Sequence, residues 1–159
     1  MADIFTKPKR SEVMSLIRST ENRATELRLI HIMREHGITG WRRGKTLRLE
    51  ETGERKLEAG MEKSGFKTLR PDFVFPMRKI AVFVDGEFWH GHPTRAKIPK
   101  TRRAWWKTKI EGNKARDRMQ NRVLRKNGWK VVRIWQYQLA RKHLFHALRK
   151  LRRVGLLSP

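Results

Sequence analysis

The chain has 159 residues, with 39 Lys and Arg against 15 Asp and Glu, which gives a formal net charge of +24. This length suits one domain with a genuine core, and the excess of positive charge favours a polyanionic partner. A chain without cysteine has no disulfide and no thiolate metal ligand. A basic protein of a ribosome or of chromatin is equally compatible with this composition.

The sequence gives no sign of membrane attachment. No apolar run approaches the roughly 18 residues of a spanning helix, and the N-terminal stretch "MADIFTKPKR" lacks the apolar core of a signal peptide. Together with the lack of cysteine, these features predict a cytoplasmic protein.

Apolar periodicity predicts helices in the N-terminal part of the chain, within residues 1–38. The stretch "KPKRSEVMSLIRST" (7–20) has loosely helical spacing, and "ATELRLIHIMREHG" (24–37) has one broad apolar face with Gly37 as its C-cap. The pattern weakens over residues 40–70, which are rich in Gly, Glu, Lys and Arg. We expect a variable excursion there, either a hairpin or a short helix.

The second half of the chain alternates strands and helices. Two runs of Val, Ile and Phe, at 72–75 and 80–84, are joined by "PMRK" and predict an antiparallel hairpin buried on both faces. A long helix is expected over 102–126, a third strand in "WKVVRIW" (129–135), and a basic amphipathic helix in "ALRKLRRVGLL" (147–157). This order predicts an α/β fold: a mixed β-sheet flanked by helices, in a single domain over residues 1–159.

Carboxylates stand at the ends of the two hairpin strands. Asp72 opens the first strand and Asp85 closes the second, so both lie at one end of the sheet, with the backbone carbonyl of Val84 and the carboxylate of Glu87 near them. Clustered acids repel each other, and Mg²⁺, which prefers oxygen ligands, resolves that conflict. The alternative is that Asp72 caps a turn and Asp85 begins an ordinary strand-ending turn.

A histidine and a further acid can join this cluster. His90 lies five residues beyond Asp85, and a neutral imidazole suits the removal of a proton from water. Asp117 shares one face of the long helix with Trp106, Ile110 and Asn113. Asp117 either pairs with a neighbouring Lys or Arg at the surface, or reaches His90 and fixes its tautomer.

Several stretches together resemble the Vsr family, the very-short-patch repair endonucleases with a PD-(D/E)xK-type nuclease core. They are "RPDFVFP", "AVFVDGEFWHGHP", "NKARDR" and "NGWKVVRIW", with "KRSEVMSLIRS" and "TELRL" near the N-terminus. The resemblance runs from about Lys9 to Leu139. It implies a restriction-endonuclease-like catalytic core over 71–139, followed by the basic C-terminal helix within 140–159.

The resemblance also implies roles for four residues, Glu26, Asp72, His90 and Asp117. Asp72 and the Val84 carbonyl are expected to bind Mg²⁺, with Asp85 as a further candidate ligand. His90 is expected to be the general base, and Glu26 and Asp117 to orient water, metal or base. Glu26 comes from the resemblance alone, because in the sequence it is an ordinary polar position on a helix.

Aromatic side chains are expected to meet DNA. Family members cut beside a T·G mismatch, the product of 5-methylcytosine deamination, and insert aromatic side chains into the base stack. The matching residues are Phe88, Trp89 and Trp106, although Phe88 is equally suited to a core. Basic and polar residues of the long helix complete the expected DNA-binding set: Lys107, Lys109, Asn113, Lys114 and Arg116.

The chain departs from the family at its structural zinc site. Glu87 and His92 stand where relatives have cysteines, and Tyr137 stands where a further ligand is common. Without thiolates, a sulphur-rich tetrahedral zinc site cannot form. We expect that the zinc is absent and that packing or ion pairing holds the loop, the alternative being a metal bound by other oxygen or nitrogen ligands.

The sequence therefore predicts a Mg²⁺-dependent endonuclease that nicks one strand of double-stranded DNA, beside a T·G mismatch. It is expected to act as a cytoplasmic, nucleoid-associated monomer, with DNA-repair proteins as candidate partners. Two alternatives remain: a nicking enzyme with another target, such as one used in defence or by a mobile element, and a DNA-binding module without activity.

Overall fold

The computed structural model describes residues 25–51 and 65–158. The helix expected over 7–20 and the part of the excursion between 52 and 64 lie outside these residues. Within the described ranges, no helix is long and apolar enough to cross a membrane.

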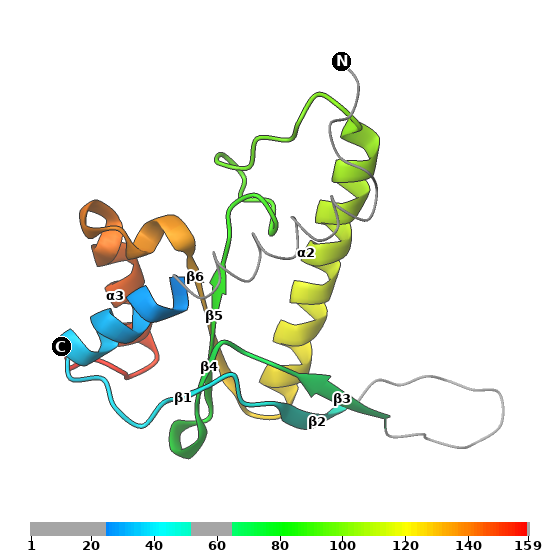
Figure 1. Ribbon diagram of the computed structural model, residues 1–159. Coiled ribbons are helices and arrows are strands. Elements are labelled where there is room, and N and C mark those ends of the chain that lie inside the picture. Colours follow the sequence, from blue (N-terminus) through cyan, green and yellow to red (C-terminus); the bar gives the residue numbers. More distant parts are fainter. Residues whose placement is uncertain (1–24, 52–64, 159) are drawn as a thin grey trace, which may run out of the picture.

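A four-stranded mixed sheet forms the centre of the molecule (Figure 1). Its strand order is β1 (Arg42–Arg43), β4 (Phe73–Phe75), β5 (Ile80–Asp85) and β6 (Lys130–Trp135). Strands β4 and β5 are antiparallel and joined by a 3₁₀ turn, and β5 and β6 are parallel. The predicted hairpin, the third strand and the mixed sheet are confirmed.

Helices cover both faces of the sheet, as Figure 1 shows. Helix α2 (Arg103–Lys126) connects β5 to β6 on one side, and ends where Gly128 adopts the left-handed conformation, with φ of +76°. The helix over residues 25–35 and helix α3 (Leu144–Arg153) lie on the other side. Gly37, with φ of +63°, ends the first helix as predicted.

The C-terminal helix differs in its bounds from the predicted 147–157. It begins at Leu144, after the 3₁₀ turns Gln136–Leu139 and Arg141–His143, and it stops at Arg153 because Gly155 is left-handed. Leu156 continues the apolar pattern of the sequence, but it reaches the core from the turn beyond the helix.

The alternation of side chains along the strands divides the core in two. Ile80, Val82 and Ile134 face the helix over 25–35 and α3, whereas Ala81 and Phe83 face α2. Arg133 is the partner of Phe83 in the β5–β6 register, so it also lies on the α2 face. Asp72 and Asp85 fall on that face by the same alternation. The sheet thus directs three charged side chains toward one helix.

The excursion contains a hairpin, the first of the two expected alternatives. Strands β2 (Leu47–Glu51) and β3 (Gly65–Leu69) pair in antiparallel register. The hairpin lies against the C-terminal end of α2, where the side-chain amide of Asn127 donates to the Glu50 carbonyl at 2.9 Å. Arg42 and Arg43, which also fall within the excursion, instead add an edge strand to the main sheet.

Candidate active site

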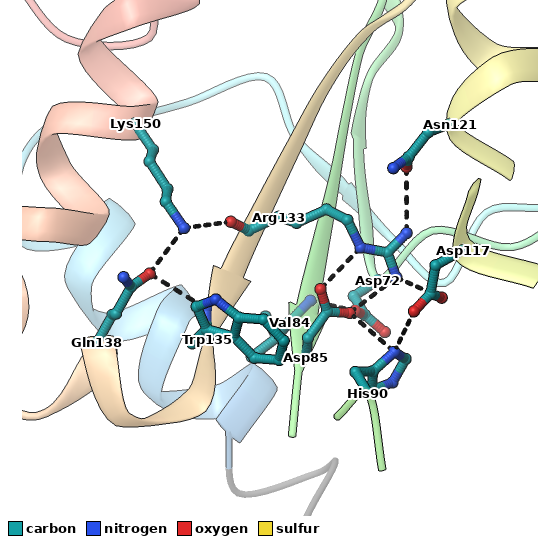
Figure 2. A network of polar contacts seen from close by, with 10 residues as sticks. All are labelled: Asp72, Val84, Asp85, His90, Asp117, Asn121, Arg133, Trp135, Gln138 and Lys150. Atoms are coloured by element: carbon teal, nitrogen blue, oxygen red, sulfur yellow. Dashed lines mark hydrogen bonds and ion pairs between the residues drawn. The ribbon is translucent and has the colours of Figure 1, made fainter. Parts of the chain in front are cut away.

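A pocket of about 280 Å³ opens between the C-terminal end of β5 and α2. The residues of its wall that bear on chemistry are Asp72, Val84, Asp85, His90, Asp117 and Arg133. The pocket therefore brings together three of the four catalytic candidates, Asp72, His90 and Asp117. It also contains the other two candidate metal ligands, the Val84 carbonyl and Asp85. Figure 2 shows how these side chains point toward one another.

Asp72 is held by the strand next to it. The backbone N–H of Val84 donates to Asp72 Oδ2 at 2.7 Å. Burial raises the pKa of Asp72 to about 6, against the lowering effect of that hydrogen bond, and the negative charges of Glu26 and Asp85 add to the rise. The carboxylate thus sits where a positive charge would stabilise it.

The donors beside Asp72 fit a hard divalent cation. In an extended strand the N–H and C=O of one residue point to the same side, so the Val84 carbonyl lies on the Asp72 side of β5. A carboxylate and a carbonyl oxygen suit a small divalent ion that keeps several waters. Among the described residues, no three His, Asp or Glu side chains gather in metal-ligand geometry. Asp72 and the Val84 carbonyl are the groups that would hold such an ion here.

His90 is oriented by Asp117. The Nδ1 atom of His90 lies 2.7 Å from Asp117 Oδ2 and 3.5 Å from Asp85 Oδ1. Burial alone lowers the pKa of His90, but the hydrogen bond to Asp117 and the charges of both carboxylates outweigh it, so the pKa is raised. With Nδ1–H donated to Asp117, Nε2 is the nitrogen left to exchange a proton.

Asp117 does not pair with its helix neighbours. Its second oxygen, Oδ1, accepts from Arg133 Nη2 at 2.7 Å, while Lys114 pairs with Glu111 at 3.0 Å. Burial alone raises the pKa of Asp117, yet the contacts with His90 and Arg133 leave it lowered. Of the two alternatives that the sequence left open, the structure has the contact with His90.

Arg133 is the residue that sequence reasoning missed. It lies on β6, a strand otherwise read as apolar, and its guanidinium holds both oxygens of Asp85 at 2.7 and 2.8 Å. A charge in the middle of a buried strand is costly unless it is paired. This cost could have identified Arg133 from the sequence, because an arginine in an apolar strand predicts an acid on the neighbouring strand.

Two of the expected acids lie elsewhere. Glu87 does not join the carboxylate cluster: the turn after Asp85 carries it toward Tyr137, whose backbone N–H donates to Glu87 Oε1 at 2.6 Å. Glu26 is not among the residues that line the pocket, and its carboxylate is paired with Arg43 of the edge strand. The negative charge of Glu26 nevertheless raises the pKa of Asp72.

Of the residues at the positions of the expected zinc ligands, His92 and Tyr137 pack against aromatic rings. The ring of His92 packs edge-on against Trp135 and Tyr137, with centroid distances of 4.7 and 5.4 Å. The guanidinium carbon of Arg95 lies over the Tyr137 ring, 4.0 Å from its centroid. Nδ1 of His92 accepts from the backbone N–H groups of Thr94 and Arg95. This set has no thiolate, so it is not a sulphur-rich zinc site, and His92 Nδ1 and Glu87 Oε1 already accept hydrogen bonds from backbone N–H groups.

The aromatic residues gather beside the pocket and outside both cores. The ring centroids of Phe88, Trp89 and Trp106 lie 5.0 to 5.9 Å apart, and Trp105, 56% exposed, packs on Trp106 at 4.7 Å. The side-chain amide of Asn113 donates to the Trp89 carbonyl at 2.8 Å. We call Phe88, Trp89, Trp105 and Trp106 the aromatic cluster.

The loop that carries Phe88 to His92 is pressed against α2. Gly91 has φ of +60°, and a Cβ added there would lie 2.6 Å from Ile110 Cγ2 and 2.5 Å from Lys114 Cε. Glycine is therefore required both by the left-handed backbone and by the close approach. Of the expected basic and polar DNA contacts, Lys109, Asn113 and Arg116 line the pocket and Lys107 is exposed near the cluster.

Comparison with known proteins identifies the family. The model of the family described as DNA mismatch endonuclease Vsr matches residues 62–96. The DNA mismatch endonuclease Vsr of Escherichia coli (strain K12) is 31% identical over 140 residues, which cover 87% of this chain and 76% of that protein. The Type II nicking enzyme V.NmeAIP of Neisseria meningitidis is 33% identical over 143 residues, covering 89% and 87%. The chain belongs to the Vsr family.

Other relatives of this Vsr-family protein match over a shorter region. The Type II nicking enzyme V.XorIIP of Xanthomonas oryzae pv. oryzae is 46% identical over 71 residues, which cover 44% of this chain and 52% of that enzyme. The chain thus spans about half the length of the relatives with the strongest local identity. The mixed sheet with helices on both faces is the restriction-endonuclease-like fold of the Vsr family, and a nuclease family of this type implies a divalent metal.

Proposed function

We propose that this protein is a Mg²⁺-dependent DNA endonuclease that nicks one strand of duplex DNA beside a T·G mismatch arising from 5-methylcytosine deamination. The observation that carries the proposal is the meeting of Asp72, His90 and Asp117 in one pocket, with the aromatic cluster next to it. The names of its relatives, a mismatch endonuclease and nicking enzymes, support the same class of reaction.

The pocket supplies the groups that phosphodiester hydrolysis needs. His90 Nε2 takes a proton from water, and the water oxygen forms a bond to phosphorus. The bond from phosphorus to the leaving sugar oxygen breaks, and that oxygen takes a proton from solvent. Asp117 keeps the imidazole in the tautomer that accepts this proton, and stabilises the imidazolium that forms. A divalent cation bound by Asp72 and the Val84 carbonyl would supply charge for the phosphate oxygens.

The aromatic cluster supports recognition of damaged DNA. A side chain inserted between base pairs costs a few kcal/mol of unstacking per step, and least where the pair is already mismatched. Asn113 fixes the backbone at Trp89, and Gly91 lets this loop lie close to α2, so the aromatic rings are held in place before DNA arrives. Such a wedge would select a mismatch through the lower cost of opening it.

Phosphate contacts are assigned to the basic side chains near the pocket. Lys109 and Arg116 line it, and the net charge of +24 makes binding steeply dependent on salt through counterion release. All the side chains named for chemistry come from one chain, which suits a monomer that makes a single nick. A place in the cytoplasm, on the nucleoid, and contact with repair proteins belong to the same proposal.

A nicking assay tests the proposal. Duplexes labelled on either strand, with a T·G pair, other mismatches or none, are incubated with Mg²⁺ and with Mn²⁺. We expect one labelled strand of the T·G duplex to be cut, and Asp72→Asn or His90→Ala to abolish the cut. Glu111→Gln, on the exposed side of α2, is the matched control and should cut normally. Equal nicking of all duplexes would overturn mismatch recognition, and binding without any cut would identify a DNA-binding module.

A further inference from the structure

Arg133 is fixed from every side. Its guanidinium donates to Asp85 through Nε and Nη2, to Asp117 through Nη2, and to Asn121 Oδ1 through Nη1 at 3.1 Å (Figure 2). Its Cζ atom lies 4.5 Å from the centroid of the Phe83 ring, and its own carbonyl accepts from Lys150 Nζ at 2.6 Å. A side chain with so many partners has one position available to it.

Arg133 divides the carboxylates of the pocket into two groups. Asp85 has both oxygens on the guanidinium, and Asp117 has one oxygen there and the other on His90. Asp72 forms no ion pair within the described part of the chain, and its hydrogen-bond donor is a neutral backbone N–H. One half of the pocket therefore already contains a cation, whereas Asp72 is a half-buried carboxylate without an ion-pair partner among the described residues.

Removing that built-in cation would change what the pocket binds. Without the guanidinium, Asp85 and Asp117 would be two carboxylates facing the same vacated space. Paired carboxylates of this kind bind divalent metal ions. Many hydrolytic sites use two metal ions held by clustered acids. Here the guanidinium takes the place that a second ion would occupy.

We propose that Arg133 is a positioning residue, a built-in cation that occupies the Asp85–Asp117 half of the pocket and so restricts the protein to one divalent ion, at Asp72. This inference rests on the metal site of the proposed function. It assigns Asp85 to Arg133 and not to the metal, and it makes the second oxygen of Asp117 available to His90 alone.

The experiment counts bound Mn²⁺ by equilibrium dialysis and by its electron paramagnetic resonance signal, with no DNA present. The wild type should bind one ion, and Asp72→Asn should weaken its binding at least tenfold. Arg133→Met, which keeps packing volume over Phe83 without the charge, should bind a second ion that persists when Asp72→Asn is added. Arg133→Lys keeps the charge and should bind one. Asn121→Ala, which removes the hydrogen bond from Arg133 Nη1 and leaves the carboxylates in place, is the matched control and should also bind one.

Asp85→Asn gives an independent arm if Arg133→Met does not fold. Because Asp85 is assigned to Arg133, this variant should bind one Mn²⁺ within threefold of the wild-type affinity. A tenfold loss in Asp85→Asn would overturn the inference, as would a single Asp72-dependent ion in folded Arg133→Met. These two outcomes would leave the metal site of the proposed function intact. A wild type without any Asp72-dependent ion would instead overturn both this inference and that metal site, so the two failures can be told apart.

Discussion

His90 Nδ1 lies 2.7 Å from Asp117 Oδ2, and the two residues come from opposite walls of the pocket, one from the loop after β5 and the other from α2. The contact fixes which ring nitrogen is presented to the pocket. Arg133 holds the other oxygen of Asp117, so the carboxylate cannot rotate without breaking one of the two interactions. His90, the proposed base, is thus oriented by Asp117 directly and by Arg133 through Asp117.

Asp117→Asn should lower the rate of nicking with little change in DNA affinity. An amide can donate to Nδ1 and turn the imidazole to the tautomer that cannot accept a proton, a change that costs about 10²–10⁴-fold in comparable base–acid pairs. Single-turnover nicking with DNA affinity measured in parallel checks this. Glu111→Gln on the same helix is the control. A rate within threefold of wild type would contradict the assigned role.

Asp72 should make the metal-free protein less stable as pH rises. Its pKa is about 6 in the folded state and near the ordinary 3.8 when unfolded, so between these values the folded state holds more protons. The contribution of Asp72 to stability is therefore greatest below about pH 4 and falls as pH rises to about 6, by roughly 3 kcal/mol at most. Denaturant unfolding in EDTA, compared with Asp72→Asn from pH 4 to 7, measures the difference. Parallel pH curves would rule out this linkage.

Gly91→Ala and Gly112→Ala should act in opposite directions. At Gly91 the new methyl meets buried Ile110 and the backbone is left-handed, so we expect a loss of about 1–3 kcal/mol and weaker nicking. At Gly112, inside α2, a Cβ meets nothing within 4 Å, and alanine should add about 0.5–1 kcal/mol through helix propensity. Chemical denaturation of both variants measures the two changes in the free energy of unfolding. Equal effects would show that the loop is not pressed against α2.

The loop that replaces the zinc site should be insensitive to chelators. His92 and Tyr137 are held by ring packing and backbone hydrogen bonds, so in Asp72→Asn, which lacks the proposed Mg²⁺ ligand, prolonged EDTA treatment should leave the melting temperature unchanged. His92→Ala should lower stability by about 1–3 kcal/mol, because it removes a ring and an acceptor for two N–H groups. Thermal melts with and without EDTA, and with added Zn²⁺, give the comparison. A fall in melting temperature with EDTA would reveal a bound structural metal.

The sequence predicted those parts of the fold whose signal is local. The runs of Val, Ile and Phe at 72–75 and 80–84 identified the hairpin, and the long helix ended near Gly128 as expected. The edge strand Arg42–Arg43 was not predicted, because two exposed arginines carry no apolar pattern. The C-terminal helix was misplaced, because Leu156 keeps the helical spacing while the chain has already turned at Gly155.

The site divides in the same way. Asp72, His90 and Asp117 were found from residue chemistry and strand ends, and the resemblance added Glu26. Arg133 was missed because its partners Asp85 and Asp117 lie 48 and 16 residues away, beyond any local pattern. Glu87 was expected near Asp72 and Asp85 but lies against Tyr137, because the conformation of a turn, unlike the alternation of a strand, cannot be read from residue types.

Glu26 should act on the pocket through its charge. Its negative charge contributes to the raised pKa of Asp72, although its own carboxylate is paired with Arg43. Glu26→Gln should therefore move the pKa of Asp72 down toward 3.8, since one of the charges opposing ionisation is removed. The carboxyl carbon resonance of Asp72, followed by NMR against pH in metal-free protein, measures the shift. Glu35→Gln, exposed on the same helix, is the control and should leave that titration unchanged. An unmoved Asp72 titration in Glu26→Gln would separate Glu26 from the pocket altogether.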